Sequence, residues 1–183
     1  MQPTLFTDRL ILRPLTLDDA EGIQQQFPHW EVVRYLNALV PWPYPADGAR
    51  TYLEQIALPA MARGEEWHWS IRLKNSPEHL IGNISLMDEQ DNNRGFWLGP
   101  QWHGQGLMTE ASAAVTDYWF GVLKRPVMRV PKAAPNLNSR RISERTGMRL
   151  IKSDEGAFVE GTFPRDIWEM TREDWLESQS SGH

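Results

Sequence analysis

The feature that most constrains this chain is a short glycine-containing segment between an apolar run and a long amphipathic pattern. The segment, Gln101-Trp102-His103-Gly104-Gln105-Gly106, follows Phe96-Trp97-Leu98 and precedes a helical pattern from Leu107 to Leu123. Glycines let a backbone turn its N–H groups toward a ligand, and a helix N-terminus adds partial positive charge and unpaired donors. The order of strand, loop and helix therefore predicts a phosphate or pyrophosphate site, with a plain strand-to-helix turn as the alternative.

This loop differs from two common phosphate-binding motifs. It lacks the lysine of a P-loop, which argues against hydrolysis of a nucleoside triphosphate. It has two glycines rather than the three of the dinucleotide fingerprint, and no βαβ unit precedes it. The spacing alone therefore assigns the loop to neither class.

Composition narrows the class of protein. With 183 residues, 40% of them hydrophobic, the chain is expected to form one domain with a sizeable core. The absence of cysteine excludes disulfides, zinc–thiolate sites and a cysteine nucleophile, and fits a cytoplasmic location. No signal peptide or membrane-spanning run is expected. The five histidines are scattered without ligand spacing, so no metal site is expected.

The charge distribution is uneven along the chain. A net charge of −5 argues against a general nucleic-acid binder. Between residues 129 and 149, however, six basic residues accompany a single acid. A basic zone near a glycine loop suits a small polyanionic ligand, and a solvated basic helix face is the alternative.

Hydrophobic periodicity predicts a single α/β domain over residues 1–177, followed by a disordered tail over 178–183. Helices are predicted at 18–27, 49–57, 107–123 and about 136–146, with Pro59 ending or kinking the second. The proline-rich and aromatic stretch from Pro28 to Pro45 is predicted to be a loop. Strands are predicted at 9–13, 67–73, 80–87, 95–98, 127–130, 149–151 and 167–171.

Several segments resemble the GNAT superfamily of N-acetyltransferases. The loop Gln101-x-x-Gly104-x-Gly106 looks like the acetyl-CoA pyrophosphate loop of that superfamily. Other segments are similar to its Rim-type branch, the ribosomal-protein alanine/serine acetyltransferases, and occur in family order. They are Thr7–Pro14, Trp97–Pro100, Asn136–Met148, and Asp154–Gly156 with the later Arg165-Asp166 and Asp174-Trp175.

The resemblance implies a GNAT fold and acetyl-CoA as cosubstrate. The implied architecture is a single mixed, mostly antiparallel sheet of about seven strands, flanked by about four helices and splayed at the acyl-CoA site. No metal is implied. The residues implied to bind the cosubstrate are Phe96, Trp97, Leu98, Gln101, Trp102, His103, Gly104, Gln105, Gly106, Leu107, Asn136 and Ser139.

Two positions depart from the family pattern. His103 stands where the family often has arginine or lysine, so a fixed positive charge is missing and affinity is expected to rise as His103 becomes protonated. Met148 replaces the usual phenylalanine, an apolar exchange that should be tolerated.

The implied chemistry is direct attack of an amine on the thioester in a ternary complex. Ser139 matches the position that the branch uses to protonate the leaving thiolate; a helix N-cap is the alternative role. Asn136 would reach the pantetheine arm, or would be a turn residue. Glu155 matches a branch glutamate given the role of general base. The rivals for that role are Asp88 and Glu89 in an acidic turn, or a water chain.

The acceptor is expected to be a primary amine, with a protein N-terminal α-amine as the branch-level expectation. The aromatic residues Trp30, Tyr35 and Trp42 are candidates for its binding wall, and a packed loop is the alternative. A small-molecule amine is an alternative acceptor, and a non-catalytic acyl-CoA-binding module is an alternative function. Branch members are often dimers, so a homodimer is one expectation.

Overall fold

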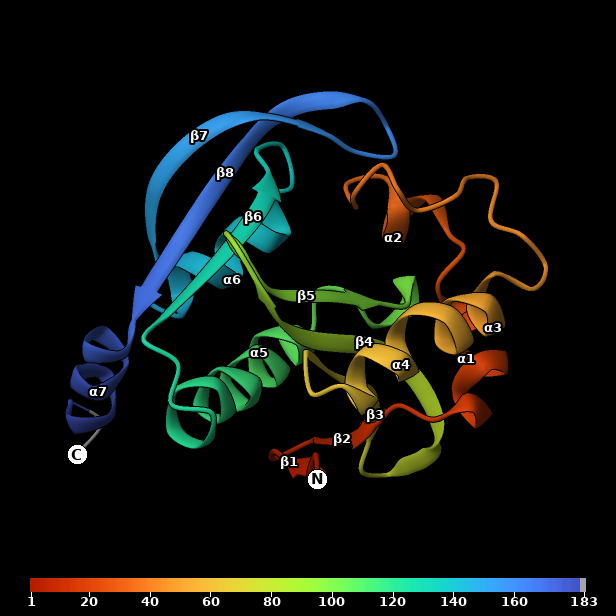
Figure 1. Cartoon of the computed structure of the whole chain (residues 1–183), viewed down its shortest axis with the longest axis horizontal. Helices are drawn as coiled ribbons and strands as arrows, with labels where there is room; N and C mark the ends of the chain where they lie inside the picture. Colours follow the sequence, from red (N-terminus) through yellow and green to blue (C-terminus); the bar gives the residue numbers. More distant parts are fainter. Residues whose placement is uncertain (182–183) are drawn as a thin grey trace.

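The computed structural model describes residues 1–181 and places eight strands in two antiparallel sheets (Figure 1). The first sheet has the order β1 (Leu5–Phe6), β2 (Leu10–Pro14), β3 (Glu66–Leu73), β4 (Ser76–Glu89) and β5 (Asn92–Leu98). The second has the order β6 (Val127–Ala133), β8 (Thr162–Thr171) and β7 (Arg149–Ala157). The predicted α/β fold is confirmed. Its eight strands are divided between two sheets, whereas a single sheet of about seven strands was predicted.

Helices cover both faces of the first sheet (Figure 1). On one face α5 packs against β2, β3 and β4, and on the other face α1, α3 and α4 form a second core. The helices are α1 (Ala20–Gln26), α2 (Trp30–Val33), α3 (Gly48–Tyr52), α4 (Leu58–Ala62), α5 (Leu107–Asp117), α6 (Leu137–Arg145) and α7 (Arg172–Ser180). None in the described part of the chain is long and apolar enough to cross a membrane.

The alternation predicted for β3 is confirmed, because its neighbouring side chains enter different cores. Trp69 packs edge to face on Tyr118, with ring centroids 5.4 Å apart, whereas His68 faces Tyr52 at 6.2 Å on the other side of the sheet. The polar positions are nevertheless buried, since helices cover this face too. Arg72 is held there by Asp19, at 2.5 Å between Nη2 and Oδ1.

The second predicted helix is longer than expected. A π-helical turn over Leu53–Ala57 connects α3 to α4, so the chain stays helical to Ala62. Pro59 lies just after this π-helical turn, in the first residues of α4, and does not end the helix.

The end of the chain also departs from the prediction. Helix α7 begins at a capping box in which Thr171 and Asp174 accept each other's backbone N–H groups, at 3.0 and 3.1 Å. Trp175 then stacks on Phe120, with ring centroids 5.8 Å apart. Residues 178–180 of the expected tail are therefore helical, and residues 182–183 lie outside the described part.

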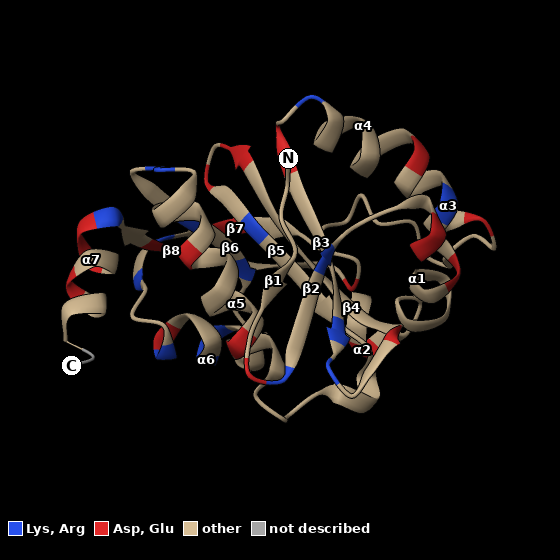
Figure 2. Ribbon diagram, turned by 90° about the horizontal axis from the view of Figure 1, so that it is seen from below, with Lys and Arg blue, Asp and Glu red and all other residues tan. Residues whose placement is uncertain are grey.

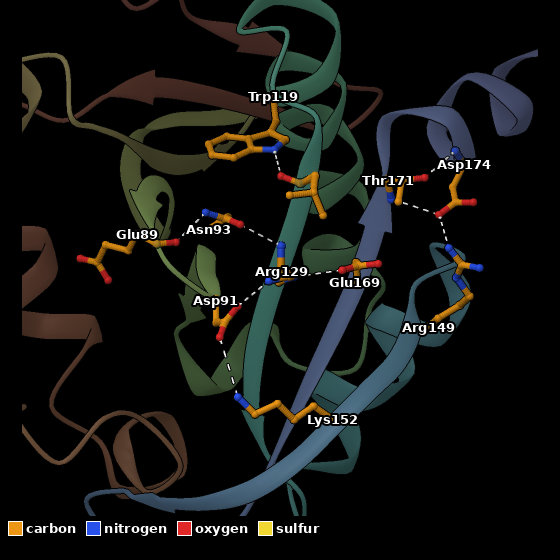
Figure 3. A network of polar contacts seen from close by, with 11 residues as sticks. Glu89, Asp91, Asn93, Trp119, Arg129, Arg149, Lys152, Glu169, Thr171 and Asp174 are labelled. Atoms are coloured by element: carbon orange, nitrogen blue, oxygen red, sulfur yellow. Dashed lines mark hydrogen bonds and ion pairs between the residues drawn. The ribbon is translucent and has the colours of Figure 1, made fainter.

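The two sheets meet at β5 and β6 without a ladder between these strands. Near the start of β5, Asn93 Oδ1 accepts the backbone N–H of Arg129 at 2.9 Å. The Arg129 guanidinium also binds Asp91 and Glu169, each at 2.9 Å (Figure 3). Side chains thus join the strands at this end, and the remaining edge of β5 stays unpaired.

Candidate active site

The glycine loop connects β5 to α5, as predicted. Gly104 and Gly106 have φ angles of 75° and 77°, in the left-handed region, and Gly106 is the N-cap of α5. A Cβ on Gly104 would meet no atom within 4 Å. The need for glycine at position 104 therefore comes from backbone conformation alone.

Only part of the loop has free N–H groups. Trp102 and His103 donate theirs to carbonyl oxygens three residues earlier, at 3.0 and 3.2 Å. The N–H groups of Gly104, Gln105 and Gly106 find no acceptor within residues 1–181. They precede an 11-residue helix, so they are candidates for anion binding. Of the predicted range Trp102–Leu107, the N–H groups of Trp102 and His103 are already bonded within the loop.

Arg9, the residue before β2, supports this loop. Its Nη1 donates to the carbonyl oxygen of Gln105 at 3.0 Å, and its Nε donates to Glu110 at 2.8 Å. Burial alone would raise the pKa of Glu110, but hydrogen bonds from Thr7 and Arg9 outweigh that effect and lower it. The ionised carboxylate therefore fixes Arg9 under the loop.

His103 turns back toward the sheet. Its Nε2 donates to the carbonyl oxygen of Leu98 at 2.7 Å, which occupies one backbone acceptor of β5 predicted to bind the pantetheine arm. Higher affinity on protonation of His103 stays a prediction, and Nδ1 is the nitrogen left to take the proton.

A cavity of about 960 Å³ lies beside the open edge of β5. Four of the residues predicted to bind the cosubstrate line it: Phe96, Trp97, Asn136 and Ser139. Leu98 and the loop from Gln101 to Leu107 lie outside its lining, farther along the chain toward α5. The structure thus divides the predicted site into an exposed loop and a cavity.

The start of α6 settles the alternative role of Ser139. Asn136 is the N-cap, and its Oδ1 accepts the N–H of Ser139 at 3.3 Å. The suggested cap role of Ser139 is therefore wrong, while contact of Asn136 with the pantetheine arm stays a prediction. Ser139 Oγ instead accepts a hydrogen bond from Lys132 Nζ at 2.6 Å.

Two buried basic side chains, Lys132 and Arg94, lie in the interior near this serine. Lys132 is 6% exposed, and burial followed by repulsion from Arg94 holds its pKa well below the usual 10.5. Arg94 is 4% exposed, and burial lowers its pKa to about 10. The Phe96 ring lies 5.3 Å from Lys132 Nζ and 5.9 Å from the Arg94 guanidinium carbon.

The structure does not bring the carboxylates proposed as general bases to Ser139. Glu155 is exposed on β7 and does not line the cavity. Asp88 is held by two hydrogen bonds from Arg125, and Glu89 accepts one from Asn92. The carboxylates that do line the cavity are Asp47 and Asp91.

The aromatic segment contributes only in part. Tyr35 lines the cavity and packs edge to face on Phe163, with ring centroids 5.8 Å apart. Trp30 and Trp42 pack on each other, and each remains 40% exposed outside the lining. Of the three aromatic candidates for the acceptor wall, the cavity therefore includes one.

Half of the basic zone is ion-paired. Arg129 is paired as described above, Arg140 binds Glu144 at 2.8 Å and Arg149 binds Asp174 at 2.9 Å. Acidic and basic residues are interspersed along the helices (Figure 2). Of the other three basic residues, Arg141 and Arg145 are exposed and Lys132 is buried.

Sequence reasoning missed Lys132, Arg94 and the bracing role of Arg9. The burial of Lys132 could have been predicted. Met128, Val130 and Lys132 occupy alternate positions of β6, and a strand places such positions on one face. All three are buried. Their partners come from distant segments, so the contacts themselves were not predictable.

The cavity fits a long ligand with a polar arm. Asn83 Oδ1 and Arg94 Nε are buried without a hydrogen-bond partner in the described residues, and both side chains line the cavity. The unpaired edge of β5 runs from this cavity to the glycine loop. Within residues 1–181 no group of three or more His, Asp or Glu side chains could hold a metal ion.

Two sheets that separate beside a glycine loop at a helix N-terminus define the class, an acyltransferase fold built for an acyl-CoA. Residues 9–149 match the family model described as the acetyltransferase (GNAT) domain. The chain therefore belongs to the GNAT acetyltransferase family, and its activity is that of an acetyl-CoA-dependent N-acetyltransferase.

Individual relatives agree with this assignment. The chain is 33% identical over 121 residues to the uncharacterised N-acetyltransferase p20 of Bacillus licheniformis, covering 64% of this chain and 66% of p20. It is 28% identical over 172 residues to YjcK of Bacillus subtilis (strain 168), named a probable N-acetyltransferase, covering 87% and 89%.

A solved structure has the same fold. It is RimL, named a ribosomal L7/L12 alpha-N-protein acetyltransferase in complex with coenzyme A. The TM-score is 0.79 at 14% identity, covering 94% of this chain and 99% of RimL.

Proposed function

We propose that this enzyme acetylates a primary amine, and that the acceptor is a protein N-terminal α-amine. The observation that carries the proposal is the cavity, which Ser139, Asn136 and Tyr35 all line. The name of the RimL relative supports this acceptor class.

The binding roles follow from the donors that the structure leaves free. The N–H groups of Gly104, Gln105 and Gly106 would hold the pyrophosphate. Asn136 uses Oδ1 for its cap, so its amide nitrogen is available to the pantetheine arm. Bound acetyl-CoA supplies the acetyl group as a thioester.

Ser139 would donate its hydroxyl proton to the leaving sulfur, because its oxygen already accepts from Lys132. Loss of the acceptor's proton is assigned to water rather than to Glu155, which is exposed outside the cavity. A free α-amine has a pKa of about 8, so a sizeable fraction is neutral near pH 7 to 8.

The proposal is tested in two stages. Calorimetric titration with acetyl-CoA and CoA should show binding that Gly104→Asp abolishes. Intact-mass analysis of candidate proteins with free N-termini, incubated with enzyme and acetyl-CoA, should then show one added acetyl group. A thiol-release screen with amino acids, polyamines and amine antibiotics is run in parallel.

The outcomes separate the alternatives. Acetylation of small amines without any modified protein would make this a small-molecule acetyltransferase. Binding with no turnover on any amine would indicate an acyl-CoA-binding module. Turnover that survives both Ser139→Ala and Glu155→Gln would remove both residues from the chemistry.

A further inference from the structure

Two buried cations at the cavity have no acidic partner in the described chain. Neither Lys132 nor Arg94 lies within ion-pair distance of any carboxylate among residues 1–181. Arg94 donates to the hydroxyl of Thr116 at 3.0 Å and contacts the sulfurs of Met128 and Met148. An uncompensated buried charge is costly, so a neutralising anion is expected from a ligand.

The acid on the neighbouring strand is bonded to another residue. Asp166 of β8 is the cross-strand partner of Lys132, but its Oδ1 accepts from Ser153 of β7 at 2.7 Å. From β5, only Arg94 faces Lys132 with a charge, and from α6 Ser139 faces it with a hydroxyl. The surroundings of Lys132 therefore disfavour its positive charge until an anion arrives.

The direction of the hydrogen bond between Lys132 and Ser139 determines where the serine hydroxyl proton can point. Lys132 Nζ donates and Ser139 Oγ accepts, so the hydroxyl proton must point elsewhere. No acceptor for that proton occurs in the described chain, and both residues line the cavity. The proton is thus available to a ligand atom in the cavity, with Lys132 behind it as a source of a second proton.

We propose that Lys132 acts through Ser139 as a proton relay to the sulfur of the departing CoA, with Arg94 favouring release of the lysine proton. This inference rests on the proposed function of the site, because it requires CoA to bind beside Ser139. The relay provides the proton that the departing thiolate requires.

The proton transfers balance as follows. The neutral amine forms a C–N bond to the acetyl carbon, the C–S bond breaks, and its electron pair stays on sulfur. The Ser139 proton moves to sulfur and a Lys132 proton replaces it on Oγ, leaving Lys132 neutral. The proton lost by the acylated nitrogen goes to water, and Lys132 regains one from water.

The inference is tested on the thiol of bound CoA, without any acceptor. The sequence contains no cysteine, so CoA carries the only thiol in the sample. The ultraviolet difference between the CoA complex and the S-methyl-CoA complex isolates the thiolate band, because S-methyl-CoA cannot ionise. A positive charge next to the sulfur should lower the thiol pKa by about one to three units relative to free CoA.

Four variants sharpen the result. Lys132→Met should return the thiol pKa to that of free CoA, and Ser139→Ala should raise it partly. Lys132→Arg keeps the charge but holds its proton, so the thiol pKa should stay low. In a separate assay with an amine acceptor from the thiol-release screen, turnover of this variant should fall at least tenfold. Lys152→Met removes an exposed cavity lysine that lies 4.0 Å from Asp91, and should leave the thiol pKa unchanged.

Each outcome has a distinct meaning. An unshifted thiol pKa in the wild-type complex, or the same shift in Lys132→Met, overturns the relay while leaving the acetyltransferase assignment intact. Failure of both CoA and S-methyl-CoA to bind would overturn the proposed site, and with it the relay. Calorimetry on the same samples separates these two failures.

Discussion

The glycine loop and the buried serine–lysine pair are two ends of one predicted cosubstrate site, yet they are built in opposite ways. The loop is exposed and offers backbone N–H groups, so its function depends on the φ angles of Gly104 and Gly106. The other end is buried and offers side chains, so its function depends on Lys132, Ser139 and what surrounds them. On the proposed function, anion binding in this molecule uses partial backbone charges at the surface and side-chain charges in the interior.

The largest expected effect is at the loop. Gly104→Asp should weaken CoA binding at least about 100-fold, because it strains a left-handed residue and places a carboxylate against phosphate. Calorimetry measures the loss. Gly64→Asp is the matched control, with φ of 70° and no atom within 4 Å of a Cβ. A similar loss in this control would mean that instability, rather than the loop, explains the result.

At the buried end of the site, substitution of Lys132 should make the protein more stable. Lys132→Met should raise the free energy of unfolding by about 1–2 kcal/mol near pH 7, since it replaces a buried amine that has no carboxylate partner in residues 1–181 with an apolar chain. Thermal melts should show an increase of about 2–4 °C per kcal/mol. A lower melting temperature would show that the charge is stabilised by contacts in the empty protein.

The same variant gives a pH test. The folded protein lowers the pKa of Lys132, so the unfolded chain binds more protons at this residue. The wild type should therefore gain stability relative to Lys132→Met as pH rises from that lowered pKa toward 10.5. Denaturant titrations of both proteins at several pH values measure the difference between their free energies of unfolding. That difference should not change with pH if Lys132 keeps an ordinary pKa.

A smaller effect is expected from the brace under the loop. Arg9→Ala removes the bond to the Gln105 carbonyl and frees Glu110, so CoA affinity should fall about fivefold to tenfold. Arg13→Ala changes an exposed arginine of β2, the strand that follows Arg9, and should leave affinity unchanged. Equal effects of the two substitutions would point to general electrostatics instead of loop geometry.

The smallest effect is at the start of α6. Asn136→Ala should cost about 1 kcal/mol of stability through loss of the cap, whereas Asn136→Ser should restore most of it. CoA affinity should stay reduced in both variants if the amide nitrogen of Asn136 binds the cosubstrate. Restoration of affinity along with stability in Asn136→Ser would limit Asn136 to its structural role.

The sequence by itself determined the features that depend on local order. The loop between β5 and α5, the alternation of β3 and the short helix predicted at about 136–146 follow from glycine and hydrophobic spacing. The resemblance added the GNAT family, which the family model confirms. Local sequence carries these features because the backbone conformation of a few neighbouring residues creates them.

Only the tertiary structure decided which side chains meet. The local sequence does not predict that the cap of α6 is Asn136 rather than Ser139. It also does not predict that Glu155 lies outside the lining of the cavity. The pairing of Lys132 with Ser139 joins β6 to α6, and Arg94 comes from β5 in the other sheet. The burial that lowers the pKa of Lys132 is a property of this junction between two sheets, and residues far apart in the chain create it together.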